Sequence, residues 1–121
     1  MNTERTGIDG NSLVMLKGTL DLVILKALSW SPMHGYEVSR QIRLRTDEAF
    51  RIEEGALYPA LRRMEKKGWL VSEWGVTDTN REAKFYDLTE EGREQLAAQL
   101  GTWQRYVETM SRVLTASEAL A

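Results

Sequence analysis

The sequence predicts a mainly α-helical protein with one small β-hairpin and a long C-terminal helix. Three observations support this fold class. Apolar residues recur at helical spacing in three successive segments, the last of which ends at Lys67. Strand-forming residues then fill 69–74, and apolar and polar residues alternate over 83–88, which is typical of paired strands. A regular apolar seam from Leu96 to Leu114 indicates the long helix.

The composition is that of a globular chain with few routes to metal or redox chemistry. The chain has 121 residues, of which 42% are hydrophobic and 28% are charged, and its length suits about one domain. It contains no cysteine, which excludes disulfides and thiolate metal sites. Its one histidine, His34, cannot form a zinc site alone. We therefore expect neither a metal nor a cofactor.

The predicted location is the cytoplasm, with no membrane partner. The polar N-terminus lacks the apolar stretch of a signal peptide. The longest apolar block, Leu20–Leu28, contains two charged residues and is too short to span a bilayer. The net charge is −2, but residues 40–67 hold eight basic and five acidic side chains, whereas 85–121 hold three basic and six acidic ones. This asymmetry is a weak hint of a nucleic-acid face.

The first helix is expected over Leu13–Ser29, after a flexible tail of residues 1–12. One apolar face carries Leu13, Leu16, Leu20, Val23, Ile24 and Ala27. A second apolar side carries Val14, Leu22 and Leu25. A helix that is apolar on two sides must be covered on both, so we expect the domain core on one side and a partner helix on the other.

Two shorter helices follow. Pro32 disfavours helical backbone at the residue before it and separates the first helix from a second over Gly35–Thr46. The polar segment 47–54 is predicted to be a connection with a short strand near Arg51. The third helix covers Gly55–Lys67 and ends at a glycine. Its core face consists of Leu57, Ala60, Leu61 and Met64.

A β-hairpin and the long helix complete the chain. The strands 69–74 and 83–88 flank a turn-rich polar loop, and Thr89 is a good N-cap for a helix that runs to Leu114. Three helices followed by a hairpin are the order of a winged helix-turn-helix, in which the third helix enters a major groove. The predicted organisation is a tail over 1–12, a DNA-binding domain over 13–89, a C-terminal dimerisation helix over 90–115 and a tail over 116–121.

The third helix carries the main candidates for DNA contact. At about 100° per residue, its exposed side gathers Tyr58, Pro59, Arg62, Arg63 and Lys66. Arg can bind a guanine edge or a phosphate, and Tyr can donate to a phosphate oxygen. Further candidates are Asn80, Arg81 and Lys84 on the hairpin and Arg40 on the second helix. A merely solvated basic face is the alternative interpretation, and the neighbouring hairpin favours DNA.

The last helix has an apolar seam with spacings of 4, 3, 4, 3 and 4 residues. Its members are Leu96, Leu100, Trp103, Val107, Met110 and Leu114. The seam can pack on the first helix of its own chain, or pair with a second subunit with the help of that helix. We favour the second arrangement, which adds Leu13, Leu16 and Leu20 to the homodimer interface. Trp103 and Met110 could also line a site for a small aromatic effector, although core packing is the simpler interpretation.

No enzyme site emerges from the sequence. Carboxylate pairs such as Glu53-Glu54 lie at helix starts, where acidic residues are expected. We find no nucleophile with a neighbouring base and no phosphate-binding glycine loop. We therefore predict that the protein is not an enzyme.

Several motifs look like those of the PadR family of transcription regulators. They are LKGTLDL (16–22), HGY (34–36), EEGALYPAL (53–61), GWL (68–70), KFY (84–86) and LTEEG (88–92). The resemblance covers Leu13 to Leu114. It implies a winged helix-turn-helix, a C-terminal dimerisation helix and repression released by a small ligand. Because the C-terminal part is a single helix, any ligand pocket would have to lie at the dimer interface. It also implies that Tyr58 and its neighbours face DNA and that Arg81 and Lys84 lie on the wing. Asp87 stands where relatives often carry a basic residue, which argues against a wing contact there.

The leading hypothesis is therefore a dimeric repressor that binds a pseudo-palindromic operator in double-stranded DNA. The alternative is a winged-helix protein-interaction module without DNA binding, which the acidic pI of about 5.5 keeps open. The salt dependence of duplex binding separates the two, because phosphate contacts give a steep negative slope.

Overall fold

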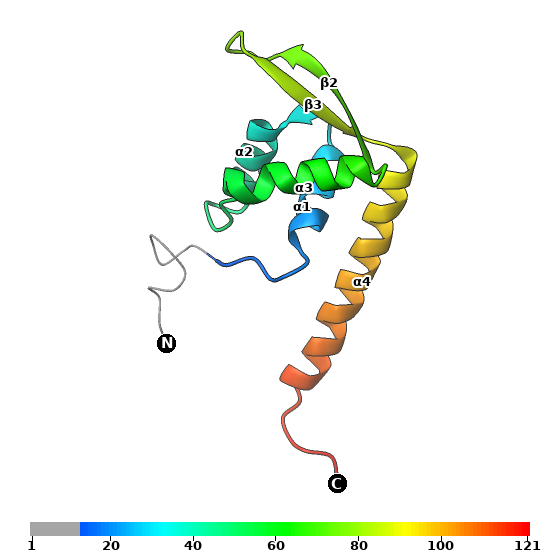
Figure 1. Ribbon diagram of the computed structural model, residues 1–121. Coiled ribbons are helices and arrows are strands. Elements are labelled where there is room, and N and C mark those ends of the chain that lie inside the picture. The colour runs from blue at the N-terminus through cyan, green and yellow to red at the C-terminus, as the bar shows by residue number, and fades with distance from the viewer. Residues whose placement is uncertain (1–12) are drawn as a thin grey trace.

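Figure 1 shows the computed structural model of the protein, which describes residues 13–121. Its elements are α1 (Leu20–Leu28), β1 (Met33–His34), α2 (Gly35–Arg45), α3 (Glu54–Lys66), β2 (Leu70–Val76), β3 (Glu82–Leu88) and α4 (Glu90–Leu114). The predicted fold class is confirmed, because three helices precede a hairpin and a long helix follows it. The expected flexible tail over 1–12 lies outside the described residues.

The first helix is shorter than the sequence predicts. Gly18 has a φ of 89°, in the left-handed region, and α1 begins only at Leu20. Leu13 and Leu16 therefore precede the helix, and their side chains are 59% and 60% exposed. The apolar spacing continued across a backbone turn, which is why a helix from Leu13 was the wrong prediction.

The sheet contains a strand that the sequence analysis missed. β3 is the central strand, in the order β1-β3-β2, and Met33 of β1 pairs with Tyr86 of β3. The short strand expected near Arg51 does not form, since residues 51–53 have no regular structure. A strand needs a free edge to pair with, and β1 occupies the edge of β3 that β2 leaves open. The hairpin strands also run further than expected, to Val76 and from Glu82.

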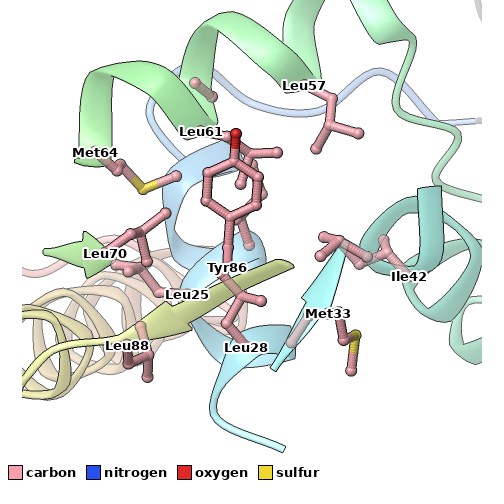
Figure 2. Packing of buried hydrophobic residues seen from close by; sticks show 14 residues of the cluster. Leu25, Leu28, Met33, Ile42, Leu57, Leu61, Met64, Leu70, Tyr86 and Leu88 are labelled. Atoms are coloured by element: carbon pink, nitrogen blue, oxygen red, sulfur yellow. The ribbon is translucent and has the colours of Figure 1, made fainter. Parts of the chain in front are cut away.

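The hydrophobic core lies between α1, α2, α3 and the sheet (Figure 2). Leu57, Leu61 and Met64 descend from α3 towards the ring of Tyr86, which rises from β3 (Figure 2). The predicted core face of α3 is confirmed, because all four of its members are buried. Each buried side chain of this size stabilises the fold by roughly 1.5–3 kcal/mol. The core therefore fixes α3 on the sheet and leaves its opposite face open.

A tight junction attaches α4 to the rest of the domain. The Thr89 hydroxyl accepts a hydrogen bond from the Gly92 N–H at 2.9 Å and donates one to the Gly68 carbonyl at 2.6 Å. The Thr89 N–H also donates to the Trp69 carbonyl at 3.0 Å. Gly92 is buried, and a Cβ added there would lie 2.1 Å from the Trp69 carbonyl oxygen. The start of α4 is thus held against the turn between α3 and β2.

The rest of α4 leaves the domain and extends well beyond it, as the yellow-to-red helix in Figure 1 shows. Its first part packs on α1, and Leu96 packs against the core. From Tyr106 to Leu114 every residue is exposed. The helix therefore has a partner within the chain along only part of its length.

Candidate nucleic-acid interface

The outer face of α3 is cationic. Pro59, Arg62 and Lys66 are exposed on the side opposite the buried leucines. These positions are separated by three and four residues, so they form one line along the helix. The predicted placement of the three residues on the exposed side agrees with the structure.

A groove runs between α3 and the hairpin and gathers most of the predicted cations. It is lined by Pro59, Arg62, Arg63, Glu65, Lys66 and Lys84. Four of these side chains are basic and one is acidic, so the groove carries a net positive charge. Lys84 comes from β3, which means that the hairpin and the third helix contribute to the same surface. Such an arrangement suits a polyanion that lies along α3.

Arg63 is partly engaged in holding the domain together. Its guanidinium Nη2 lies 2.5 Å from Oδ1 of Asp21 on α1, and 48% of its side chain remains exposed. This ion pair links α3 to α1, and α1 in turn packs on α4. Arg63 thus differs from Arg62, which makes no such ion pair among residues 13–121.

The single acidic residue of the groove is tied to the hairpin. The Ser72 hydroxyl on β2 donates to the Glu65 carboxylate at 2.7 Å. Burial raises the pKa of the neighbouring Tyr86 hydroxyl, the charge of Glu65 raises it further, and Arg62 opposes this effect. Glu65, Ser72 and Tyr86 therefore link α3 to the sheet. This link sets the spacing between α3 and Lys84.

Tyr58 is less exposed than the sequence analysis predicts. Its ring packs against the core and covers Gly35, where an added Cβ would lie 2.6 Å from a ring carbon. Burial, with a smaller effect of Glu54, raises the pKa of the Tyr58 hydroxyl above its ordinary value of 10.0. The hydroxyl therefore keeps its proton at neutral pH and can donate a hydrogen bond. Tyr58 both supports the contact of α2 with α3 and adjoins their outer surface.

The tip of the hairpin is an ordered turn outside the groove. The Thr77 N–H donates to the Arg81 carbonyl at 2.8 Å, and the Arg81 N–H donates to the Thr77 hydroxyl at 3.2 Å. Asn80 has a φ of 64°, a conformation that asparagine tolerates better than most residues. Asn80 and Arg81 are exposed in this tip. The loop that joins β2 and β3 lies away from α3 in Figure 1. They could contact only a ligand that reaches beyond the groove.

Arg40 lies outside the groove as well. Its guanidinium pairs with the Glu37 carboxylate one turn earlier on α2, at 2.9 Å. The Arg40 side chain is 43% exposed, and an ion pair of this kind contributes little to stability. The pair could therefore open at low cost to a competing anion.

One exposed side chain beside the groove was missed by the sequence analysis. Trp74 on β2 is 67% exposed and lies directly opposite Lys84 in the hairpin register. The residue type alone does not show this position. Only the register of the two strands brings the indole next to a groove residue.

The predicted dimer residues divide into two groups in the structure. Leu20 and Leu96 pack against the core of their own chain, and Trp103 is half-buried beside α1. The others are 36–71% exposed, and they are Leu13, Leu16, Leu100, Val107, Met110 and Leu114. The sequence left two arrangements open for the α4 seam, packing on α1 of the same chain and pairing with a second subunit. Packing on α1 involves only part of the seam. The start of the seam packs on α1, and its remaining members are exposed in the single chain.

Within residues 13–121 the structure shows neither a membrane-spanning helix nor a metal-binding cluster. No helix there is both long enough and apolar enough to traverse a bilayer. No group of three or more His, Cys, Asp or Glu side chains within the same residues is arranged to hold a metal ion.

Comparison with known proteins adds a second line of observation. Residues 24–98 match the family model of the transcriptional regulator PadR-like family. An uncharacterized protein of Lysinibacillus sphaericus is 31% identical over 94 residues, which cover 78% of this chain and 86% of that protein.

Solved structures give the same result. A transcriptional regulator from Clostridium thermocellum superposes with a TM-score of 0.73 at 32% identity, over 79% of this chain and 93% of that one. A PadR family transcription regulator from Clostridium difficile gives a TM-score of 0.70 at 30% identity, over 80% and 99% of the two chains. A PadR-like transcriptional regulator from Bacillus cereus gives 0.73 at 29% identity, over 85% and 98%.

Proposed function

This chain belongs to the PadR-like family of transcriptional regulators, and from that membership we propose that it is a dimeric repressor that binds a specific DNA sequence. The observation that carries the proposal is the cationic groove between α3 and the hairpin. In a winged helix-turn-helix, the third helix lies in the major groove and the wing reaches the flanking backbone. The domain division into 13–89, 90–115 and 116–121 is part of the proposal.

The proposed contacts follow the position of each residue. Arg62 and Lys66 face the major groove from α3, with Pro59 and the hydroxyl of Tyr58 alongside. The remaining proposed contacts lie on phosphates or in the minor groove, and they are Arg40, Arg63, Asn80, Arg81 and Lys84. Arg63 would have to exchange Asp21 for a phosphate, so we expect a smaller contribution from it than from Arg62.

The proposed dimer uses the free part of the α4 seam together with Leu13 and Leu16. These exposed apolar side chains would otherwise remain in water. Two-fold symmetry would place the two α3 helices on half-sites about 10 base pairs apart, or a multiple of this spacing. The operator would accordingly be pseudo-palindromic.

A small effector is the proposed means of release. A crevice between the start of α1 and α4 is lined by Gly18, Leu22, Gln95, Ala98, Gln99, Thr102 and Trp103. It adjoins the free seam, so a second subunit would help to close it. The Trp103 indole suits a small aromatic compound. We further propose that the protein acts in the cytoplasm, without a cofactor and without enzymatic activity.

The experiment that tests DNA binding is a salt titration with duplexes selected from a random library. We expect a steep negative slope of log affinity against log salt, because each phosphate contact releases about 0.9 counterions. A flat slope, or no binding to any duplex, would favour the alternative of a protein-interaction module.

Arg62→Ala should weaken binding to the selected duplex by roughly 10-fold or more, because a bidentate arginine–guanine pair contributes about 1–3 kcal/mol. Tyr58→Phe should cause a smaller loss, since it removes only the hydroxyl. Tyr58→Ala would also remove packing on Gly35 and is therefore expected to destabilise the fold as well. Arg105→Ala on the exposed surface of α4 is the matched control and should bind like the wild type. An unchanged affinity for Arg62→Ala would remove this residue from the contact surface.

A further inference from the structure

The face of the hairpin that turns towards α3 can be followed residue by residue through the strand register. Ser72 pairs with Tyr86, and the next pair on the same face is Trp74 with Lys84, because alternate residues share a face. Ser72 is bonded to α3 through Glu65, and Tyr86 is buried beneath α3. Trp74 therefore continues the face that packs against α3, one step further towards the tip.

At Trp74 the hairpin has passed the end of the core. Tyr86, which pairs with Ser72, is 4% exposed. Trp74, two residues after Ser72 on the same strand, is 67% exposed. Val76 follows on the same face and is 62% exposed. A large indole thus stands in water at the edge of the domain, where burial by a ligand would release a substantial apolar area.

The charges around the indole restrict what the ligand can be. Lys84 lies directly across the strands from Trp74, at a separation that puts the two side chains in contact range, and Arg62 and Lys66 continue the cationic surface on α3. Of the two acidic residues on this face, Glu65 is held by Ser72, and Glu82 lies opposite Val76 nearer the tip. A ligand that fits this surface would carry negative charge opposite the lysines and arginine and an apolar group opposite the indole. Duplex DNA has this pattern, since its phosphates alternate with sugar C–H groups along each groove wall.

We propose that Trp74 is an apolar DNA contact of the wing, whose indole packs on the sugars of the strand that Lys84 holds by a phosphate. This inference rests on the proposed function and adds a contact that does not depend on charge. Packing of the indole on the sugars would restrict the orientation of the wing on the DNA backbone. The ion pair of Lys84 with a phosphate would add affinity but would restrict the orientation much less. Trp74 would therefore act with α3 in setting the register on the operator.

The test uses the full chain and a fluorescently labelled duplex selected from a random library, with affinity measured across a range of salt concentrations. Trp74→Ala should weaken binding about 10-fold at every salt concentration and leave the salt slope unchanged. Lys84→Ala should reduce the magnitude of the slope by about 0.9, because one phosphate contact is lost. Trp74→Phe, which keeps an aromatic ring, should recover most of the affinity.

Val71→Ala is the matched control. Val71 is 54% exposed on the same strand but on the opposite face of the sheet, so its removal should not affect DNA binding. Thermal unfolding of the Trp74 and Val71 variants should match the wild type, since both side chains are exposed. Lys84 is half-buried, so thermal unfolding of Lys84→Ala measures any loss of stability separately from its DNA affinity. If the wild type binds the duplex and Trp74→Ala binds equally well, the indole is not a DNA contact, although the proposed function stands. If the wild type binds no duplex at any salt concentration, both proposals fail.

Discussion

Gly92→Ala should lower the free energy of unfolding by roughly 3 kcal/mol, at the upper end of the cost of overpacking. The added Cβ would lie 2.1 Å from the Trp69 carbonyl oxygen, which belongs to the backbone and cannot rotate away. The first turn of α4 would have to move, and this movement would stretch the hydrogen bonds of Thr89 to the turn between α3 and β2. Thermal denaturation should show a melting temperature lower by about 10 °C or more.

Gly101→Ala provides the matched control in the same helix. An added Cβ at Gly101 meets no atom within 4 Å. Alanine is a better helix former than glycine by roughly 1 kcal/mol, so this variant should be more stable than the wild type. Both substitutions replace glycine by alanine in the same helix, and they are expected to change the free energy of unfolding in opposite directions. Equal stability of the two variants would show that the junction at Trp69 is not as tight as described.

Val107→Asp should convert the proposed dimer into monomers. Val107 lies in the middle of the free seam and is 42% exposed in the single chain. In a two-fold dimer each substitution places two carboxylates in one apolar interface, and burial of unpaired charges costs several kcal/mol. The dimer dissociation constant should therefore rise by about 100-fold or more, which corresponds to about 2.8 kcal/mol. Sedimentation analysis at micromolar concentration measures this change.

The loss of the dimer should also remove tight binding to a two-half-site operator, while the domain itself stays folded. Thr109→Asp is the control, because it adds the same charge to an exposed position on α4 outside the seam. That variant should remain dimeric. A wild-type protein that is monomeric at micromolar concentration would contradict the proposed assembly without affecting the fold.

The elements that local chemistry determines were predicted well. α3 and α4 have uninterrupted apolar spacing, and each has a clear signal at one end: Gly68, with a φ of 86°, follows α3, and Thr89 caps α4. The hairpin was found from its alternation and its polar tip. The core face of α3 followed directly from the 3.6-residue period, and so did the cationic face behind it.

Most of the errors arise from contacts between distant segments, and one arises from a local turn. β1 is only two residues long and exists because it pairs with β3 more than fifty positions later, which no local pattern encodes. The helix expected from Leu13 begins only at Leu20, because the chain turns at Gly18 and the apolar spacing before this glycine is not helical. Trp74 is an ordinary strand residue in the sequence. It becomes a candidate contact only through the register that places it across from Lys84.

The placement of the site residues was predicted more fully than their bonding. Helical geometry placed Arg62, Arg63 and Lys66 on one accessible surface, as observed. It could not show that Arg63 is bonded to Asp21, because that partner lies 42 residues earlier in the chain. Nor could it show that the ring of Tyr58 covers Gly35, since this depends on how closely α2 approaches α3.

The tight attachment of α4 has a mechanical consequence. A helix of 25 residues is about 37 Å long, and it is fixed at its first turn to the backbone that immediately follows α3. Any tilt of the far end would be transferred to the domain as a rigid rotation instead of being absorbed by a hinge. In a symmetric pair, a small change in the crossing angle of the two long helices would move the two α3 helices in opposite senses. The separation of those two helices would thus be adjusted from a point far away from them.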